Sequence, residues 1–297
     1  MTALLLTAAH KIHIVVRPRP SFVCASPRST GATRDLGSTE GAHARSTDVA
    51  SAARRVSSSA TTLPDPRSSI LEGKRLAHDG TVRDDPALIE RARVLFVSAT
   101  AAPPFAALAH YHAAYAGYRL ARLPRDADGH ADPTGHVATA ITHLHSALEA
   151  NPQDAEALAL LAVCYGMRAG KRIHHTARDG PAIGRAMGQA RGLAPGNPRI
   201  WMLHAASLAN RPALLGGSTT EARQSYEMAL ALFPVWTVPT ELHPDWGWAE
   251  AHAMLGLARL KENDAPAARV AFEHALAIAP DYALVKHEWL PQAIQAT

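Results

Sequence analysis

Histidine is the residue best placed to bind a metal or to catalyse a reaction in this 297-residue sequence, which contains 17 histidines and two cysteines. The pairs His110/His112 and His143/His145 are two residues apart, so on a helix they point in different directions and cannot chelate one ion. The neighbouring histidines at 174 and 175 have no cysteine or pair of carboxylates beside them. No H-E-x-x-H or C-x-x-C spacing occurs. We therefore expect no bound metal and no cofactor.

Few other residues qualify as a nucleophile. Cys164 lies between Val163 and Tyr165 in an apolar stretch, where a cysteine usually packs as a small hydrophobic residue. Ser218 follows two glycines, but its segment lacks the lysine of a phosphate-binding loop and the G-x-S-x-G order of a nucleophile elbow. We expect no enzymatic activity. An enzyme remains an alternative if the insertions and histidine-rich helices bring histidine and carboxylate side chains together in one cleft.

Tryptophan is concentrated near the C-terminus. Trp236, Trp246 and Trp248 lie in or beside a proline-containing segment, residues 235–246, and Trp289 follows. Exposed tryptophans would be anchors for a partner, because each buries a large area on contact. Buried ones would instead attach this segment to the chain's own helices. The prolines favour a rigid segment packed on its own domain, and the first interpretation stays open.

Helices must position these side chains, because one pattern recurs five times along the chain. In it a small residue is followed by a bulky residue four positions later, a second small residue three positions after that, and a proline five positions further on. Only the third unit differs, because Ile183 occupies the first position, where the other units have a small residue. Such internal repetition is typical of helical repeat arrays. The five units are Ala92/Phe96/Ala99/Pro104, Ala140/Leu144/Ala147/Pro152, Ile183/Met187/Ala190/Pro195, Ala222/Tyr226/Ala229/Pro234 and Ala268/Phe272/Ala275/Pro280.

Residues 249–280 are the clearest unit. The pattern of Leu255, Gly256, Ala268, Phe272, Ala275 and Pro280 resembles the tetratricopeptide repeat (TPR), a helix–turn–helix unit of about 34 residues. The resemblance implies an all-α fold, a right-handed α-solenoid of about five TPR-like helical hairpins. We expect a C-terminal capping helix over residues 282–293. The prolines recur at longer intervals than the family period, which indicates insertions at 124–135, 170–180, 211–217 and 235–246.

Local signals predict where the helices begin. Asp85, Asn151 and Asn197 each precede a proline and are expected to cap a helix, and residues 218–221 form a capping box. The sequence predicts a short first helix at 70–78. The first helices of the later hairpins are expected at 104–123, 152–169, 198–210 and 247–262. The uncharged stretch 94–118 is expected to form two helices of a soluble stack, because two prolines interrupt it.

Charge divides the chain into a tail and a domain. Residues 1–66 lack apolar periodicity and are predicted to be a disordered tail, with a possible targeting segment in the acid-free first 34 residues. Residues 67–297 are predicted to form the repeat domain. Its charge is nearly balanced, which argues against a nucleic-acid-binding surface. A cytoplasmic location is favoured, and an exported protein is the alternative.

The resemblance, together with the lack of a catalytic constellation, implies a non-enzymatic scaffold that binds a protein or peptide partner. The residues of its concave face predict a largely apolar groove. The balanced charge and the interrupting prolines predict no nucleic acid and no membrane span. An exported, envelope-associated repeat protein is an alternative. The positions that hold a carboxylate in chaperone-binding members of the family are apolar here, so no chaperone-clamp ligand is expected. The candidate partner-binding residues are Val163, Met202, Ala206 and Leu257, with Trp236, Trp246 and Trp248 at the mouth of the groove.

Overall fold

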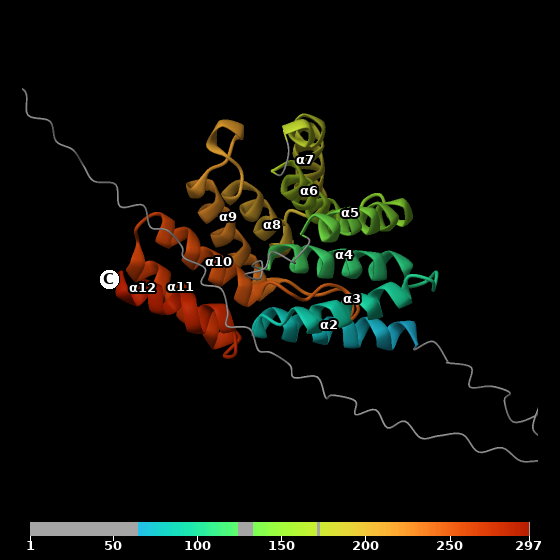
Figure 1. Cartoon of the computed structure of the whole chain (residues 1–297), viewed down its shortest axis with the longest axis horizontal. Coiled ribbons are helices and arrows are strands. Elements are labelled where there is room, and N and C mark those ends of the chain that lie inside the picture. Colours follow the sequence, from blue (N-terminus) through green and yellow to red (C-terminus); the bar gives the residue numbers. More distant parts are fainter. Residues whose placement is uncertain (1–64, 124–132, 171–172, 297) are drawn as a thin grey trace, which may run out of the picture. The chain divides into compact units, whose positions relative to one another are not determined.

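The computed structural model describes residues 65–123, 133–170 and 173–296, where the regular structure is helical and no strand occurs (Figure 1). Of the predicted tail, residues 1–66, and the predicted insertion, residues 124–135, the parts 1–64 and 124–132 fall outside these ranges. Residues 65–66 and 133–135 are described and stand at the starts of helices. The α-helices are α2 (Pro66–Arg83), α3 (Pro86–Ala99), α4 (Ala106–Arg122), α5 (Pro133–Ala150), α6 (Ala155–Ala169), α7 (Ile173–Leu193), α8 (Pro198–Ala209), α9 (Thr219–Leu232), α10 (Trp248–Lys261), α11 (Ala265–Ile278) and α12 (Leu290–Gln295).

Consecutive helices pack in pairs, α2 with α3, α4 with α5, α6 with α7, α8 with α9 and α10 with α11. A five-residue π-helical turn, Val285–Trp289, and then α12 pack on α11 at the C-terminal end. The predicted all-α solenoid of about five hairpins with a C-terminal cap is therefore confirmed.

The recurring small and bulky residues form the contacts inside each hairpin. All of the small and bulky residues in the five units are buried. A Cβ atom built on Gly256 of α10 would lie 2.4 Å from the ring of Phe272 in α11. The same arrangement occurs in the first hairpin, where a Cβ on Gly73 would lie 2.5 Å from the ring of Phe96. In both hairpins the missing side chain lets an aromatic ring pack directly against a helix backbone.

The capping residues are mostly where the sequence places them. Asp85 accepts hydrogen bonds from the backbone of Ala87 and Leu88, Asn197 caps α8, and Ser218 caps α9. The prediction for α6 is wrong. Asp154 caps this helix by accepting from the backbone of Ala157, and Asn151 instead accepts from the backbone of Gln153 within the preceding turn.

Two predicted segments have different bounds. The first helix is α2, which is longer than the predicted 70–78 because Asp65 caps it just before Pro66 and accepts from the backbone of Ser68. The segment 170–180 is not an irregular insertion, since α7 already begins at Ile173. Its Asp179 is buried and pairs with Arg168 at 2.8 Å, which joins α7 to the end of α6.

The uncharged stretch 94–118 is divided between α3 and α4, as predicted. Among the described residues, no helix combines the length and the apolar character that crossing a membrane requires.

Residues 236–247 connect the end of α9 to the start of α10, and we call this segment the strap. It extends away from α9 and α10 to lie beside α3 and α4, as the orange segment of Figure 1 shows. Side chains of α2 and α4 hold its backbone, so the strap joins the first two hairpins to the last two.

Candidate functional site

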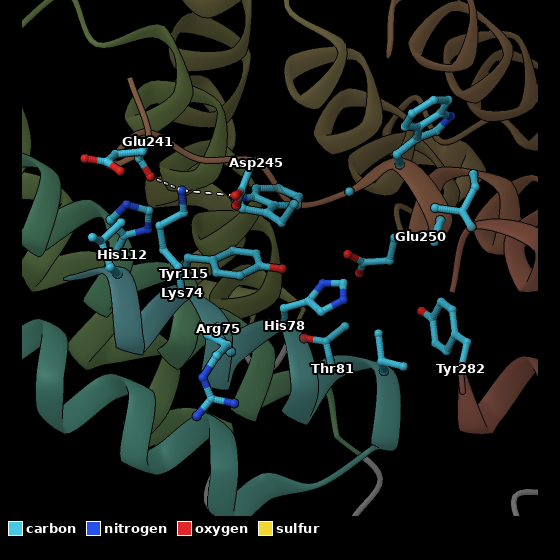
Figure 2. Close-up of a pocket in the computed structure, with 18 of the residues that line it drawn as sticks. Lys74, Arg75, His78, Thr81, His112, Tyr115, Glu241, Asp245, Glu250 and Tyr282 are labelled. Carbon is cyan, nitrogen blue, oxygen red and sulfur yellow. Dashed lines mark hydrogen bonds and ion pairs between the residues drawn. The ribbon is translucent and has the colours of Figure 1, made fainter. Parts of the chain in front are cut away.

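A cavity of about 610 Å³ lies where the strap meets α2 and the start of α10 (Figure 2). Its walls come from segments that are far apart in the sequence, α2, α4, the strap, α10 and the residues after α11. Apolar and aromatic side chains supply most of the lining area, and eight of the nineteen lining residues are charged or polar. The volume is within the roughly 300–1,000 Å³ that is usual for ligand pockets.

Lys74 of α2 holds the strap on one side of the cavity. Its ammonium group donates to the backbone carbonyl of Glu241 and, at 2.7 Å, to the carbonyl of His243. It also forms an ion pair with Asp245 at 3.1 Å. These two hydrogen bonds and the ion pair tie α2 to the strap, so Lys74 positions the strap and its charge is balanced by Asp245.

His112 of α4 binds the same part of the strap. Its Nε2 atom lies 2.7 Å from the carbonyl oxygen of Leu242, and since a carbonyl can only accept, Nε2 carries the hydrogen. The ring stacks on Phe96 with 5.0 Å between centroids. Burial, and secondarily the charge of Lys74, lowers the pKa of His112 to about 4. The imidazole is thus neutral near pH 7.

Tyr115 of α4 and Trp246 of the strap form a stacked pair on another wall, with 4.3 Å between ring centroids and 19° between planes. The Tyr115 side chain is 4% exposed, and burial raises its pKa to about 12, so the phenol is protonated at neutral pH. Its hydroxyl points into the cavity and has no hydrogen-bond partner among the described residues (Figure 2).

Beyond Trp246 a buried polar network fixes the end of the strap. The indole of Trp246 donates to the Tyr111 hydroxyl at 3.3 Å, and that hydroxyl donates to Glu156 of α6 at 3.0 Å. Glu156 also accepts from Arg199 and Asn197 of α8, at 2.7 Å in each case. The network gives every member a partner and ties three successive hairpins to the strap.

Glu250, in the first turn of α10, supplies a carboxylate to the cavity. The residue is 5% exposed, and its Oε1 atom forms an ion pair with Arg119 of α4. Figure 2 shows the carboxylate turned toward the space between Tyr115, His78 and Thr81. The Thr81 hydroxyl oxygen is buried and has no hydrogen-bond partner in the described part of the chain.

The predicted groove residues are mostly inside the protein. Val163, Met202 and Ala206 are buried, and Leu257 is half-buried against the C-terminal core cluster. The strap contributes to this cover, because Gly247 lies against the Met202 thioether. Burial of these side chains leaves no exposed apolar strip between them. Their role in partner binding stays a prediction.

The tryptophans divide between two environments. Trp246 and Trp248 line the cavity, and Trp248 is 41% exposed while its ring stacks on Phe233 at 6.3 Å. Trp236 is half-buried away from the cavity lining, with the Arg199 guanidinium 5.8 Å from its ring centroid. At Trp236 and at Trp246, near its two ends, the 235–246 segment packs on its own domain, which is the arrangement that the prolines favour.

Sequence reasoning missed the polar residues of the cavity, Lys74, Tyr115 and Glu250. One signal was available in α4, where His112 and three tyrosines occur in a helix otherwise rich in alanine. The ring nitrogens and hydroxyl groups of these α4 side chains need hydrogen-bond partners when buried, and so do the polar groups of the strap. The sequence does not show that α4 and the strap pair with each other, because more than a hundred residues separate them.

Comparison with known proteins adds information on the fold alone. No family model matches the sequence, and a search of curated proteins finds no significant match. Among solved structures, the chain is similar to TTC0263, a thermophilic TPR protein of Thermus thermophilus, with a TM-score of 0.54 and 16% sequence identity. The match covers 78% of this chain and all of the other. Together with the repeated hairpins, this likeness shows that the chain has the tetratricopeptide-repeat fold.

Proposed function

We propose that this chain is a non-enzymatic scaffold that binds a peptide segment of a protein partner in the cavity between α2, the strap and α10. Helical repeat stacks commonly bind partners on the face formed by successive repeats. Here the strap covers part of that face and leaves the cavity beside it. The observation that carries the proposal is the Tyr115 hydroxyl, which ends a side chain that is otherwise buried, points into the cavity and lacks a partner among the described residues.

The state of the charged side chains supports binding rather than catalysis. A general base or nucleophile must have an available atom that faces the substrate. Lys74 is held by two strap carbonyls and by the ion pair with Asp245, and His112 donates to the carbonyl of Leu242 while its ring stacks on Phe96. Both groups position the strap, which supports a binding role for this wall of the cavity.

A peptide library displayed on phage, selected on the full chain, tests the proposal. The affinity of a selected peptide is then measured by calorimetry for the parent and for Trp248→Ala, which removes an exposed aromatic wall of the cavity. We expect a loss of about tenfold or more, because aromatic anchors dominate such contacts. Met228→Ala is the matched control, since Met228 is similarly exposed on α9 and does not line the cavity.

Equal loss of affinity in the two variants, or selected peptides that bind both as tightly as the parent, would place binding on another surface. A selection that yields no peptide with a preference for this chain over a control helical protein of similar size would contradict a peptide-binding function. Melting curves of both variants must match that of the parent, so that a change in affinity is not a change in folding.

A further inference from the structure

The positive charges that line the cavity are already used. Lys74 donates to two strap carbonyls and forms an ion pair with Asp245. Arg75 is turned away from the cavity in Figure 2, and its guanidinium binds Glu72 and Asp79 of its own helix, with distances of 2.6–2.9 Å. Each of these cations is therefore already balanced by an acid of the protein, which disfavours an anionic ligand.

The hydrogen-bond acceptors of the cavity, in contrast, are not fully used. Glu250 has a hydrogen bond at Oε1, and no bond at its second oxygen is found among the described residues. The hydroxyl oxygens of Tyr115 and Thr81 lack partners in the same part of the structure. The side chains of Glu241 and Asp245 at the rim are more than half exposed.

We propose that the cavity takes a protonated amine or a guanidinium group, presented by a lysine or arginine side chain of the bound peptide. This inference rests on the proposed function. Such a group carries only donors and fits a wall of acceptor oxygens. The aromatic rings of Tyr115, Trp246 and Trp248 add favourable contact for a cation near their faces. Arg119 balances the charge of Glu250, and the hydroxyls of Tyr115 and Thr81 can donate as well as accept, so the preference for a cation comes from the second oxygen of Glu250 and from the carboxylates of Glu241 and Asp245 at the rim.

Four small probes test the inference on the full chain, with binding followed by calorimetry and by the fluorescence of the wall tryptophans. They are the peptide Ac-Gly-Arg-Gly-NH2, its neutral citrulline analogue, its glutamate analogue, and agmatine, which carries the guanidinium without a peptide. We expect the arginine peptide to bind about tenfold more tightly than the citrulline peptide, and the glutamate peptide to be weakest, since charge-assisted hydrogen bonds are the stronger kind. Equal binding of the arginine and citrulline peptides, or tighter binding of the glutamate peptide, would overturn the inference.

Variants assign the effect to the cavity. Tyr115→Phe keeps the ring that stacks on Trp246 and removes only the hydroxyl, and we expect it to weaken the arginine peptide about fivefold. Glu250→Gln keeps an acceptor for Arg119 and should weaken it about tenfold or more. Glu273→Gln is the control, because this acid is exposed on α11 and is not part of the cavity lining. If Glu250→Gln does not fold, Tyr115→Phe and the probe series still decide, and an effect of the control equal to that of Tyr115→Phe would refute the site.

The two proposals fail in different ways. Library peptides that lose affinity for Trp248→Ala, together with no preference for arginine over citrulline, would leave the scaffold function standing and reject the cationic ligand. Agmatine bound as tightly as the arginine peptide, with no library peptide selected, would support the cation site and reject peptide binding. Arginine or lysine in the selected peptides, with loss of binding on its replacement by citrulline or norleucine, would support both.

Discussion

Gly73 and Gly256 perform the same role in the first and last hairpins, since each accepts an aromatic ring of the paired helix against its backbone. The family pattern in the sequence includes Gly256, which stands in the clearest repeat, and the structure adds its contact with the ring. The pattern does not include Gly73, because the first helix lacks the family's residues around that glycine. A one-atom substitution tests how closely these residues pack.

Gly256→Ala should destabilise the domain by about 1–3 kcal/mol, because the new Cβ would lie within van der Waals radius of the buried Phe272 ring. The free energy of unfolding in urea measures the effect. Gly188→Ala is the control, since this glycine is exposed in α7 with no atom within 4 Å of the built Cβ. We expect that variant to be stabilised by up to about 1 kcal/mol. Equal stability of the two variants would contradict the close contact.

Protonation of His112 should make the domain less stable in mild acid. Its pKa is about 4 in the folded chain, against about 6.5 in an unfolded one, so between these values only the unfolded state takes up the proton. The stability contribution is complete above pH 6.5 and is lost as the pH falls toward 4. Lys74, Asp245 and Glu156 are the charged groups that influence this ring.

We expect the free energy of unfolding to fall by about 2 kcal/mol on account of this residue between pH 7.5 and pH 5. His112→Gln cannot be protonated, while its amide can still donate to the Leu242 carbonyl. The pH dependence of urea unfolding should therefore be smaller in the variant. His204 and His252 also have a pKa lowered to about 4 and add to the dependence in both proteins. An unchanged slope would show that His112 is not held neutral.

At the scale of elements, the start of α6 shows which of two possible capping residues, Asn151 or Asp154, the helix uses. Asn151 stands before a proline, as caps often do, but Asp154 accepts the hydrogen bond from the backbone of Ala157. Asp154→Ala should therefore cost about 1 kcal/mol, and Asn151→Ala clearly less, in thermal or urea unfolding. The reverse order would restore the cap that the sequence suggested.

The hairpins were predictable because their information is local. A helix and its partner are joined by a short turn, and the small and bulky residues that form their contact repeat at a fixed spacing. The bounds that were wrong at α2 and α6 depend on which of several capping residues is used, and spacing does not decide this. The strap follows neither rule, since its partners lie on helices that precede it by more than a hundred residues.

At the scale of the whole domain, the strap lies across helices of the first two hairpins and borders a cavity beside them. The sequence singled out Trp236, Trp246 and Trp248 as candidates at the mouth of a groove, and two of them, Trp246 and Trp248, line the cavity. It could not identify Tyr115 or Glu250. Their positions become meaningful only when α4 and α10 are brought together around the strap.

The strap can be tested as a connection between the first and last parts of the domain by removing its main donor. Lys74→Met deletes two hydrogen bonds to strap carbonyls and the ion pair with Asp245, and it keeps a side chain of similar length. Residues 236–247 should then exchange their amide hydrogens at least about tenfold faster, as measured by mass spectrometry, because local opening costs less once these bonds are gone. Arg75→Met is the matched control, since the neighbouring Arg75 binds only acids of its own helix among the described residues and should leave exchange in the strap unchanged. Faster exchange throughout the domain in Lys74→Met would mean that the strap opens only with global unfolding, and no change in either variant would mean that Trp246 and its buried network hold the strap without Lys74.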